Sequence, residues 1–385
     1  MERVLTEGRV PIKLWLEDLD EEALQQARNL ANLPFAFKHI AIMPDSHPGY
    51  GMPIGGVLAA RQAIIPNAVG VDIGCGMCSM RTNRQEIPEG ELKAIMGIIR
   101  DRVPVGFNHH DRPQDERWMP GREEGPTPIV DREYRKARSQ VGTLGGGNHF
   151  IEIQQGSDGY IWIMIHSGSR NIGYTVARHY NELAQEKCGQ WFSEVPKDLA
   201  FFPRGTEEFE RYRHEMNYCI RFAEHNRRLM MERVKEAFEK VIPMADFTDY
   251  INKPHNFAAW ERHYGEEVIV HRKGATRARK NERGMIPGSQ GSPSYIVRGK
   301  GNHLSFESCS HGAGRLMSRR QARETLSVQK ETAALEKMGV LHAVRGESDL
   351  DEAPGSYKDI TEVMDRQKDL VEVEVELKPL AVIKG

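Results

Sequence analysis

The stretch YIWIMIHSGSRNIG, residues 160–173, changes character halfway along its length. Its first six residues are apolar and rich in β-branched and aromatic side chains, which is typical of a buried strand. Small and polar residues follow, which are typical of a turn. The pattern therefore predicts a strand that delivers His166 and a turn that delivers Arg170.

The same arrangement recurs along the chain and decides the fold class. Short apolar runs that end in, or precede, a turn or polar cluster are HIAIM (39–43), GGVLAA (55–60), EEVIVH (266–271), SYIVRG (294–299) and VEVEVEL (371–377). Residues 16–33, 91–102 and 206–241 have helical periodicity. Strands and helices do not alternate as in a doubly wound sheet, so the sequence predicts an α+β fold. No repeat or clear linker divides the chain, so we expect a single domain over residues 1–385.

Composition limits the classes of function. With 39% hydrophobic and 28% charged residues, the chain is expected to be an ordinary soluble globular protein. It has no run of about 18 apolar residues and no signal-like opening, so we expect a cytoplasmic protein without a membrane segment. A net charge of −2 excludes a general basic field, so nucleic-acid binding would be local. The segment HRKGATRARKNER (271–283) is one candidate, and a solvated basic loop is the alternative.

A glycine-rich turn, VGVDIGCGMCS (69–79), carries candidate metal ligands. Asp72 and Cys75 lie three residues apart, so one turn could aim a carboxylate and a thiolate at the same cation. The alternative is a capping aspartate beside a buried cysteine. Cys75 and Cys78 also form a CxxC pair, but no second pair exists to complete a zinc site, and the five scattered cysteines do not indicate a disulfide framework.

Three histidines lie on similar turns and strengthen the metal hypothesis. His149, His166 and His255 each sit on a glycine-rich or polar turn next to an apolar run, and with Asp72 and Cys75 they predict a centre with nitrogen, oxygen and sulfur donors. Each histidine alone could equally be structural.

The segment GTLGGGNHFIE (142–152) places Glu152 three residues after His149. A carboxylate accepts the paired N–H donors of guanine, so Glu152 would select guanine if a purine binds. A glycine-rich turn followed by an acid that favours a helix N-terminus is the alternative.

His311 lies in SCSHGAGRLMSRR (308–320), between small residues and close to three arginines. The free space and the positive charge suit a triphosphate or a nucleic-acid phosphate, although a satisfied turn histidine has the same local sequence. The loop IPGSQGSPSY (286–295) could cradle phosphates with its amides and hydroxyls, but it lacks the P-loop lysine.

Taken together, the ordered motifs resemble the RtcB family of GTP-dependent RNA ligases. From about residue 41 to the terminus, the motifs that carry the resemblance are PDSHPGYGMPIGG, VGVDIGCGM, GGGNHFIE, HSGSRNIG, HRKGATRA, IPGSQGSPSY, SHGAGR, EAPGSYKDI and the terminal IKG. The resemblance implies a single large α+β domain, with mixed sheets surrounded by helices and a central active-site cleft.

The resemblance also implies roles for individual residues. His311 would be the nucleophile that takes GMP from GTP and releases pyrophosphate. Two manganese ions would be held by Asp72, Cys75, His149, His166 and His255, with the Cys75 thiolate bridging them. Guanylate would be contacted by Asn148, Glu152, Ser289, Ser294, Ala313, Gly314, Tyr357 and Lys384. Arg170 and Arg319 would hold RNA phosphate, and Asp45 would be an acid near the reacting 3′ end, with its role in catalysis unsettled.

The implied reaction joins RNA ending in a 2′,3′-cyclic phosphate or 3′-phosphate to RNA with a 5′-hydroxyl, in tRNA splicing or RNA repair. The cyclic phosphate is opened, GMP moves from His311 to the 3′-phosphate, and the 5′-hydroxyl displaces GMP. We expect a monomer, with an activating accessory protein as a further partner. By the usual affinity order such donors favour zinc, so manganese is expected from the resemblance, and we expect zinc to inhibit.

Two other function classes stay open. A dinuclear phosphoesterase would need the metal ligands but not Glu152, Lys384 or His311. An RNA-binding subunit with a structural metal would need the basic loop but not the Gly/Ser loop. The sequence does not choose between splicing and repair, or between complete ligation and guanylylation of ends. Segments 104–133 and 194–215 match no motif, and 106–133 is polar and rich in Pro and Gly, so a long surface loop is predicted there.

Overall fold

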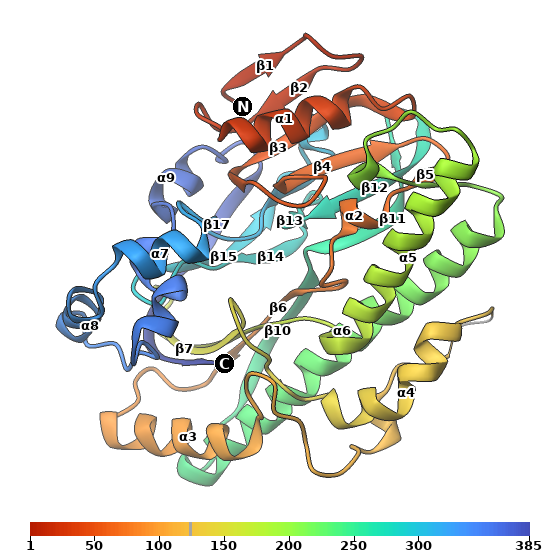
Figure 1. The fold of residues 1–385 in the computed structure, drawn as a ribbon. Coiled ribbons are helices and arrows are strands. Elements are labelled where there is room, and N and C mark those ends of the chain that lie inside the picture. The colour runs from red at the N-terminus through yellow and green to blue at the C-terminus, as the bar shows by residue number, and fades with distance from the viewer. Residues whose placement is uncertain (123–124) are drawn as a thin grey trace.

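The computed structural model describes residues 1–122 and 125–385, and two large β-sheets dominate this part of the chain (Figure 1). The six-stranded sheet has the order β1-β2-β3-β4-β12-β11, and the seven-stranded sheet has the order β10-β6-β8-β7-β17-β15-β14. Two small sheets pair β13 with β16 and β5 with β9. Most pairings are antiparallel and β2 with β3 is parallel, so the predicted α+β class with mixed sheets is confirmed.

The six-stranded sheet is buried on both faces along its centre. Its strands are β1 (Arg3–Leu5), β2 (Ile12–Leu14), β3 (Ala36–His47), β4 (Ile54–Ala60), β12 (Glu266–Lys273) and β11 (Asn256–His263). Alternate residues of β3 enter different cores: Ile40 and Ile42 pack with α1 (Glu21–Ala31), whereas Ala41 and Met43 face the other side. Burial on both faces explains why this strand reads as a continuous apolar run.

The seven-stranded sheet contains the predicted strand that ends in His166, which lies inside the sheet as β8, between β6 and β7. Its strands are β10 (Phe247–Pro254), β6 (Gly76–Thr82), β8 (Ile161–Ser167), β7 (Phe150–Gly156), β17 (Val371–Lys384), β15 (Ser294–Gly299) and β14 (Arg283–Ile286). Ile163 and Ile165 of β8 pack on the side of α3 (Glu89–Arg102) and α6 (Glu207–Val241), whereas Met164 points to the opposite face. His166 follows Met164 by two residues, so strand geometry turns its ring away from the helices.

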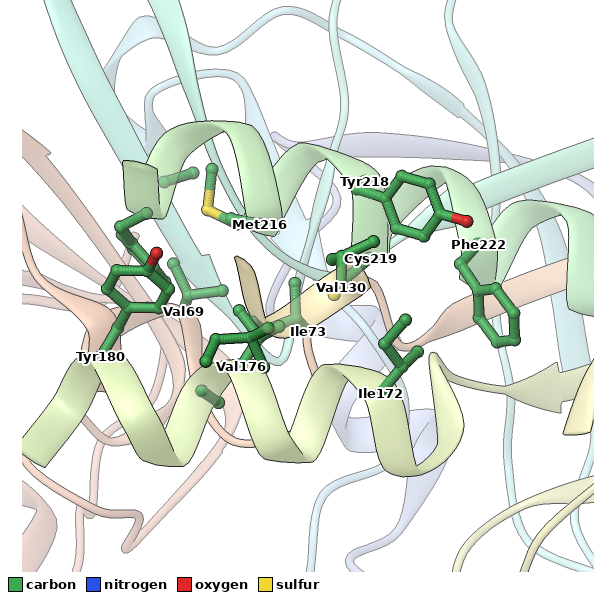
Figure 2. Close-up of a cluster of buried hydrophobic side chains, with 14 of the residues drawn as sticks. Val69, Ile73, Val130, Ile172, Val176, Tyr180, Met216, Tyr218, Cys219 and Phe222 are labelled. Carbon is green, nitrogen blue, oxygen red and sulfur yellow. The ribbon is translucent and has the colours of Figure 1, made fainter. Parts of the chain in front are cut away.

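Helices α5 (Arg170–Gln190) and α6 lie side by side and enclose a further core (Figure 2). Val176 from α5 and Met216 from α6 pack in this cluster, together with Ile73. Ile73 comes from the turn after α2 (Pro66–Val69), so the same core anchors the turn that carries Asp72. The predicted helix over 206–241 is confirmed as one element, and its cap, Thr206, accepts a hydrogen bond from the Phe209 backbone N–H.

The prediction of a continuous loop over 106–133 is wrong in its last part. A 3-10 turn, η1, spans Glu116–Trp118, and α4 begins at Pro128 and ends at Gln140. Proline suits the first turn of a helix, and the next residues, Ile129 and Val130, are buried against α5 and α6. Composition alone therefore concealed a packed helix start; residues 123–124 of this stretch lie outside the described part of the chain.

The remaining elements are short or lie at the edges of the sheets. They are β5 (Ala63–Ile64), η2 (Lys197–Leu199), β9 (Phe202–Pro203), β13 (Ala275–Arg277), η3 (His303–Ser305), β16 (Ser308–Ser310), α7 (Arg319–Thr325), α8 (Val328–Lys337), η4 (Glu347–Glu352), η5 (Pro354–Ser356) and α9 (Ile360–Asp365). None of the described helices combines the length and the apolar character that crossing a membrane requires.

Candidate active site

Turns from both large sheets and the C-terminus enclose one cavity of about 300 Å³. Predicted site residues that line it are Asp72, Cys75, Asn148, Glu152, His166, His255, Ser289, His311, Ala313, Gly314, Arg319, Tyr357 and Lys384. These residues are scattered over more than 300 positions of the sequence, so the fold brings together most of the predicted site.

On one side of the cavity the predicted metal ligands are in mutual contact. The Cys75 sulfur lies 3.4 Å from His149 Nε2 and 3.3 Å from His166 Nε2, and these three donor atoms all lie within 4.8 Å of one another. Asp72 Oδ2 is 3.1 Å from His149 Nε2, and His255 Nε2 is 3.3 Å from His166 Nε2. The five side chains therefore converge, as the sequence predicted.

The tautomers of two histidines fit a cation. His149 Nδ1 lies 3.0 Å from the Leu144 carbonyl and His166 Nδ1 lies 3.0 Å from the Asn148 carbonyl, so each Nδ1–H donates outward. Each Nε2 then directs a lone pair toward Cys75. Burial lowers the pKa of His166 and of His255 well below the usual value, which favours neutral imidazoles. The Nε2 lone pairs of His149 and His166 thus converge on Cys75, an arrangement that a metal ion would satisfy.

Helix α6 fastens the turns that carry these donors. Asn226 donates to the carbonyls of Thr143 and Gly168 and accepts from the Gly142 and Thr143 backbone N–H groups. Arg227 donates to the carbonyls of Gly74 and Ser167 at 2.9 Å each. Sequence reasoning treated this helix as scaffold and missed both residues. The signal was present, because an adjacent amide and guanidinium on the buried face of an amphipathic helix need partners.

His311 lies between the metal ligands and the rest of the cavity. Its ring centre is 4.8 Å from that of His255, and its Nδ1 lies 2.6 Å from Asp45 Oδ2. The same carboxylate oxygen accepts the backbone N–H groups of His311 and Gly312 at 3.1 and 3.3 Å. Asp45 is fully buried behind the ring and does not line the cavity. It therefore fixes the Nδ1–H tautomer and leaves Nε2 available.

Two further contacts fix this arrangement. Lys358, which sequence reasoning did not single out, donates to the carbonyls on both sides of Asp45, those of Pro44 (3.3 Å) and Ser46 (2.6 Å). Gly314 has φ +76°, and a side chain there would begin 2.0 Å from the Asp45 carbonyl oxygen. The small residues after His311 thus let the Asp45 strand approach closely.

The opposite side of the cavity carries the predicted guanylate residues. Glu152 is buried, burial raises its pKa to about 8, and Gln154 donates to its carboxyl group. Lys384 Nζ lies 3.0 Å from Glu352 Oε2, and the Tyr357 hydroxyl donates to the same oxygen. Ser294 is buried and accepts the Gly288 N–H, so it supports the Gly/Ser loop and does not line the cavity.

Glu352 is a further residue that sequence reasoning missed. It lines the cavity and pairs with Lys384, with Arg315 at 3.3 Å and with Arg319 at 3.4 Å. Although burial opposes ionisation, the positive groups around Glu352 hold its pKa below the usual value. The sequence did contain a clue, because Glu352 is the first residue of the motif EAPGSYKDI, but no role was predicted for it.

The two predicted phosphate-binding arginines flank one glycine turn. The Arg170 guanidinium lies 3.3 Å from Thr143 Oγ1 and 3.4 Å from His149 Nδ1, outside the cavity lining. A side chain at Gly145 would collide with Arg170, and one at Gly147 would lie 2.9 Å from Arg319. The glycines of this turn therefore make room for both guanidinium groups.

Comparison with known proteins agrees with the motifs. The family described as "tRNA-splicing ligase RtcB" matches residues 26–385. An RNA-splicing ligase RtcB from Escherichia coli (strain K12) is 40% identical, covering 99% of both chains. A tRNA-splicing ligase RtcB from Nanoarchaeum equitans is 32% identical over 98% of this chain and 95% of its own length, and an RNA-splicing ligase RtcB homolog from Entamoeba dispar is 31% identical over 94% and 82%. The predicted resemblance is confirmed, and the chain belongs to the RtcB family.

Proposed function

We propose that this protein is a GTP-dependent RNA ligase that joins 2′,3′-cyclic phosphate or 3′-phosphate ends to 5′-hydroxyl ends through a guanylate on His311. The observation that carries the proposal is the position of His311, whose Nδ1 is held by Asp45 between a cluster of metal donors and a pocket with Glu152 and Lys384. The names of its relatives, RNA-splicing ligase and tRNA-splicing ligase, support an RNA ligase.

In the first step, the lone pair of His311 Nε2 attacks the α-phosphorus of GTP. A nitrogen–phosphorus bond forms, the bond to the bridging oxygen breaks, and pyrophosphate leaves. The Asp45 carboxylate accepts the hydrogen bond from Nδ1–H and so stabilises the positive charge that develops on the ring. Asp45 is thus proposed as a positioning residue rather than a proton acceptor from substrate.

The donor set fits divalent ions, and we propose two manganese ions held by Asp72, Cys75, His149, His166 and His255. When bound, they would supply positive charge that offsets the crowded phosphates. Cys75 would contribute a thiolate to this donor set.

Guanine is proposed to bind on the opposite side of His311. Ionised Glu152 accepts the N1–H and the exocyclic amine, and Lys384 donates to the O6 carbonyl. Asn148, Ser289, Ala313, Gly314 and Tyr357 line the rest of this pocket, and Ser294 positions the loop that carries Ser289. Adenine would place an acceptor against the carboxylate, so the pocket favours guanine.

The remaining steps act on RNA. Water opens the cyclic phosphate, the resulting 3′-phosphate takes GMP from His311, and the 5′-hydroxyl displaces GMP to form the new phosphodiester. Arg170 and Arg319 flank the 145–147 turn, and we propose that they hold RNA phosphates there. We further propose that residues 1–385 act as one cytoplasmic catalytic domain and as a monomer, with an activating accessory protein.

The test is a labelling experiment. The purified protein is mixed with α-labelled GTP and manganese, without RNA, beside a His311→Ala variant. We expect acid-labile, alkali-stable label on the wild type alone. If neither protein is labelled although metal is bound, the ligase mechanism is wrong and a phosphoesterase becomes the better explanation.

A further inference from the structure

The loop over residues 104–114, which matched no motif, is tied to the turn that carries the metal donors. The Gly106 N–H donates to the Gly145 carbonyl and the Leu144 N–H to the Pro104 carbonyl, both at 2.9 Å. At its other end, the His110 N–H donates to the Ser139 carbonyl of α4 at 3.0 Å. The loop therefore bridges the edge of the active site and α4, and it lies beside the C-terminal strand (Figure 1).

Two exposed aromatic rings lie on this edge. Phe107, directly after Gly106, is fully exposed. Tyr174 is 50% exposed and lies one turn after Arg170 on α5. Gly106 is hydrogen-bonded to Gly145, and the Arg170 guanidinium lies against Gly145, so both rings lie near the same glycine turn. Exposed rings beside a nucleic-acid site are suited to stacking on unpaired bases of any sequence.

A histidine and two cations, Lys136 and Arg170, lie near one another on this edge. His109 Nε2 is 3.2 Å from the amide nitrogen of Gln140, and Lys136 precedes Gln140 by one helical turn, on the same face of α4. Burial and then the charges of Lys136 and Arg170 lower the pKa of His109, as expected if both cations are near the ring. Lys136 is exposed and has no acidic partner within 4 Å among the residues that the structure describes.

We propose that an unpaired strand of the RNA substrate leaves the active site across Phe107, His109, Lys136, Arg170 and Tyr174, here called the rim strip. The proposal rests on the proposed function, because it starts from Arg170 beside the metal ligands. Phosphates contact Arg170 and Lys136, and the two rings stack on bases. A surface that combines exposed rings and cations matches single-stranded nucleic acid better than a protein surface, whose interface core is usually depleted of lysine.

The experiment compares a double variant, Phe107→Ala with Lys136→Gln, with a matched control, Phe192→Ala with Lys240→Gln. Phe192 and Lys240 are also exposed. Phe192 lies just after the C-terminal end of α5, and Lys240 lies in the last turn of α6. Binding of two fluorescent oligonucleotides is measured by anisotropy across a salt series. One has a free 5′-hydroxyl and an unreactive 3′ end, and the other has a 3′-phosphate and a blocked 5′ end.

We expect the rim-strip variant to bind one oligonucleotide about tenfold more weakly, with its salt slope reduced by about one, and to bind the other normally. The affected oligonucleotide then identifies the strand. Equal loss for both, or the same loss in the control, would overturn the proposal. Unchanged binding of both would also overturn it and would leave an accessory protein as the occupant. Labelling of His311 with GTP and manganese in the absence of RNA, on the same preparations, tests the proposed function separately.

Discussion

The two sides of the cavity are prepared for their ligands in different ways. On the metal side, His149 and His166 direct lone pairs at Cys75, and no hydrogen is available to satisfy all three. On the guanylate side, Lys384 and Tyr357 are already satisfied by a carboxylate, that of Glu352. The metal ligands therefore lack a cation that would satisfy them, whereas Lys384 and Tyr357 are satisfied by the Glu352 carboxylate in the absence of nucleotide.

This difference predicts different costs of binding. The metal side is fixed by bonds from Asn226 and Arg227 to backbone groups, and these bonds need not change when an ion enters. On the guanylate side, Lys384 must leave Glu352 before it can donate to a base. A nucleotide therefore has to exchange partners there, and the predictions below test each half in order of expected effect.

The largest effect is expected at the centre of the metal side. Cys75→Ala removes the atom that contacts both histidines, so we expect ligase activity and bound manganese to fall at least 100-fold. Metal content and His311 labelling measure the two losses. Cys78→Ala is the matched control, because Cys78 is also buried and its sulfur interacts with the Arg227 carbonyl, at 3.8 Å, and with Tyr250. Equal loss in both variants would contradict the assignment.

Removing the support from α6 should have a smaller effect on the same side. Asn226→Ala removes the acceptor of the Gly142 N–H, one of the two acceptors of the Thr143 N–H, and the amide donor to the Thr143 and Gly168 carbonyls, so we expect manganese affinity to fall about 10- to 100-fold. Titration of manganese into the folded variant measures this change. Asn217→Ala, on the partly exposed face of the same helix, should match the wild type. Wild-type affinity in Asn226→Ala would mean that the turns hold their own shape.

On the guanylate side, the pH dependence of base binding tests Glu152. Its pKa is raised to about 8, so it is largely protonated at neutral pH, whereas guanine requires the carboxylate. The ionised fraction, and therefore guanosine affinity, should rise about tenfold between pH 6.5 and 7.5. Guanosine avoids the titration of phosphate groups, and calorimetry measures its binding. Glu152→Gln should abolish the dependence, and a flat wild-type profile would contradict this role.

The six apolar runs and the three helical segments could be read from the sequence because local periodicity marks them, whereas α5 was not predicted. The runs at 39–43 and 161–165 are apolar on both faces, which only a buried strand or helix core allows. The helix that begins at Pro128 could not be read, because its first turn has the composition of a loop and is fixed by packing against α5 and α6.

The candidate site divides in the same way. Side chains on glycine-rich turns, such as His149 and His311, carry local signals and family motifs, so they could be predicted. Asn226, Glu352 and Lys358 were not predicted, because key partners are distant in the sequence: Gly142 is 84 positions from Asn226, Lys384 is 32 from Glu352 and Ser46 is 312 from Lys358. Only the folded structure shows that each of these side chains contacts a site residue, or the turn that carries one, from a distant part of the sequence.

The smallest effect is the one that separates the two halves most sharply. Glu352→Gln keeps the shape of the side chain but removes the charge that pairs with Lys384, Arg315 and Arg319. Without nucleotide, we expect the variant to be less stable by about 2 kcal/mol, because buried cations lose their partner. GTP no longer has to break these pairs, so it should raise the Tm of the variant by more than it raises that of the wild type. Glu347→Gln, at an exposed acid of the same 3-10 helix, is the control. If GTP raised the Tm of both proteins equally, Glu352 would be a fixed support, and both halves of the cavity would be preformed.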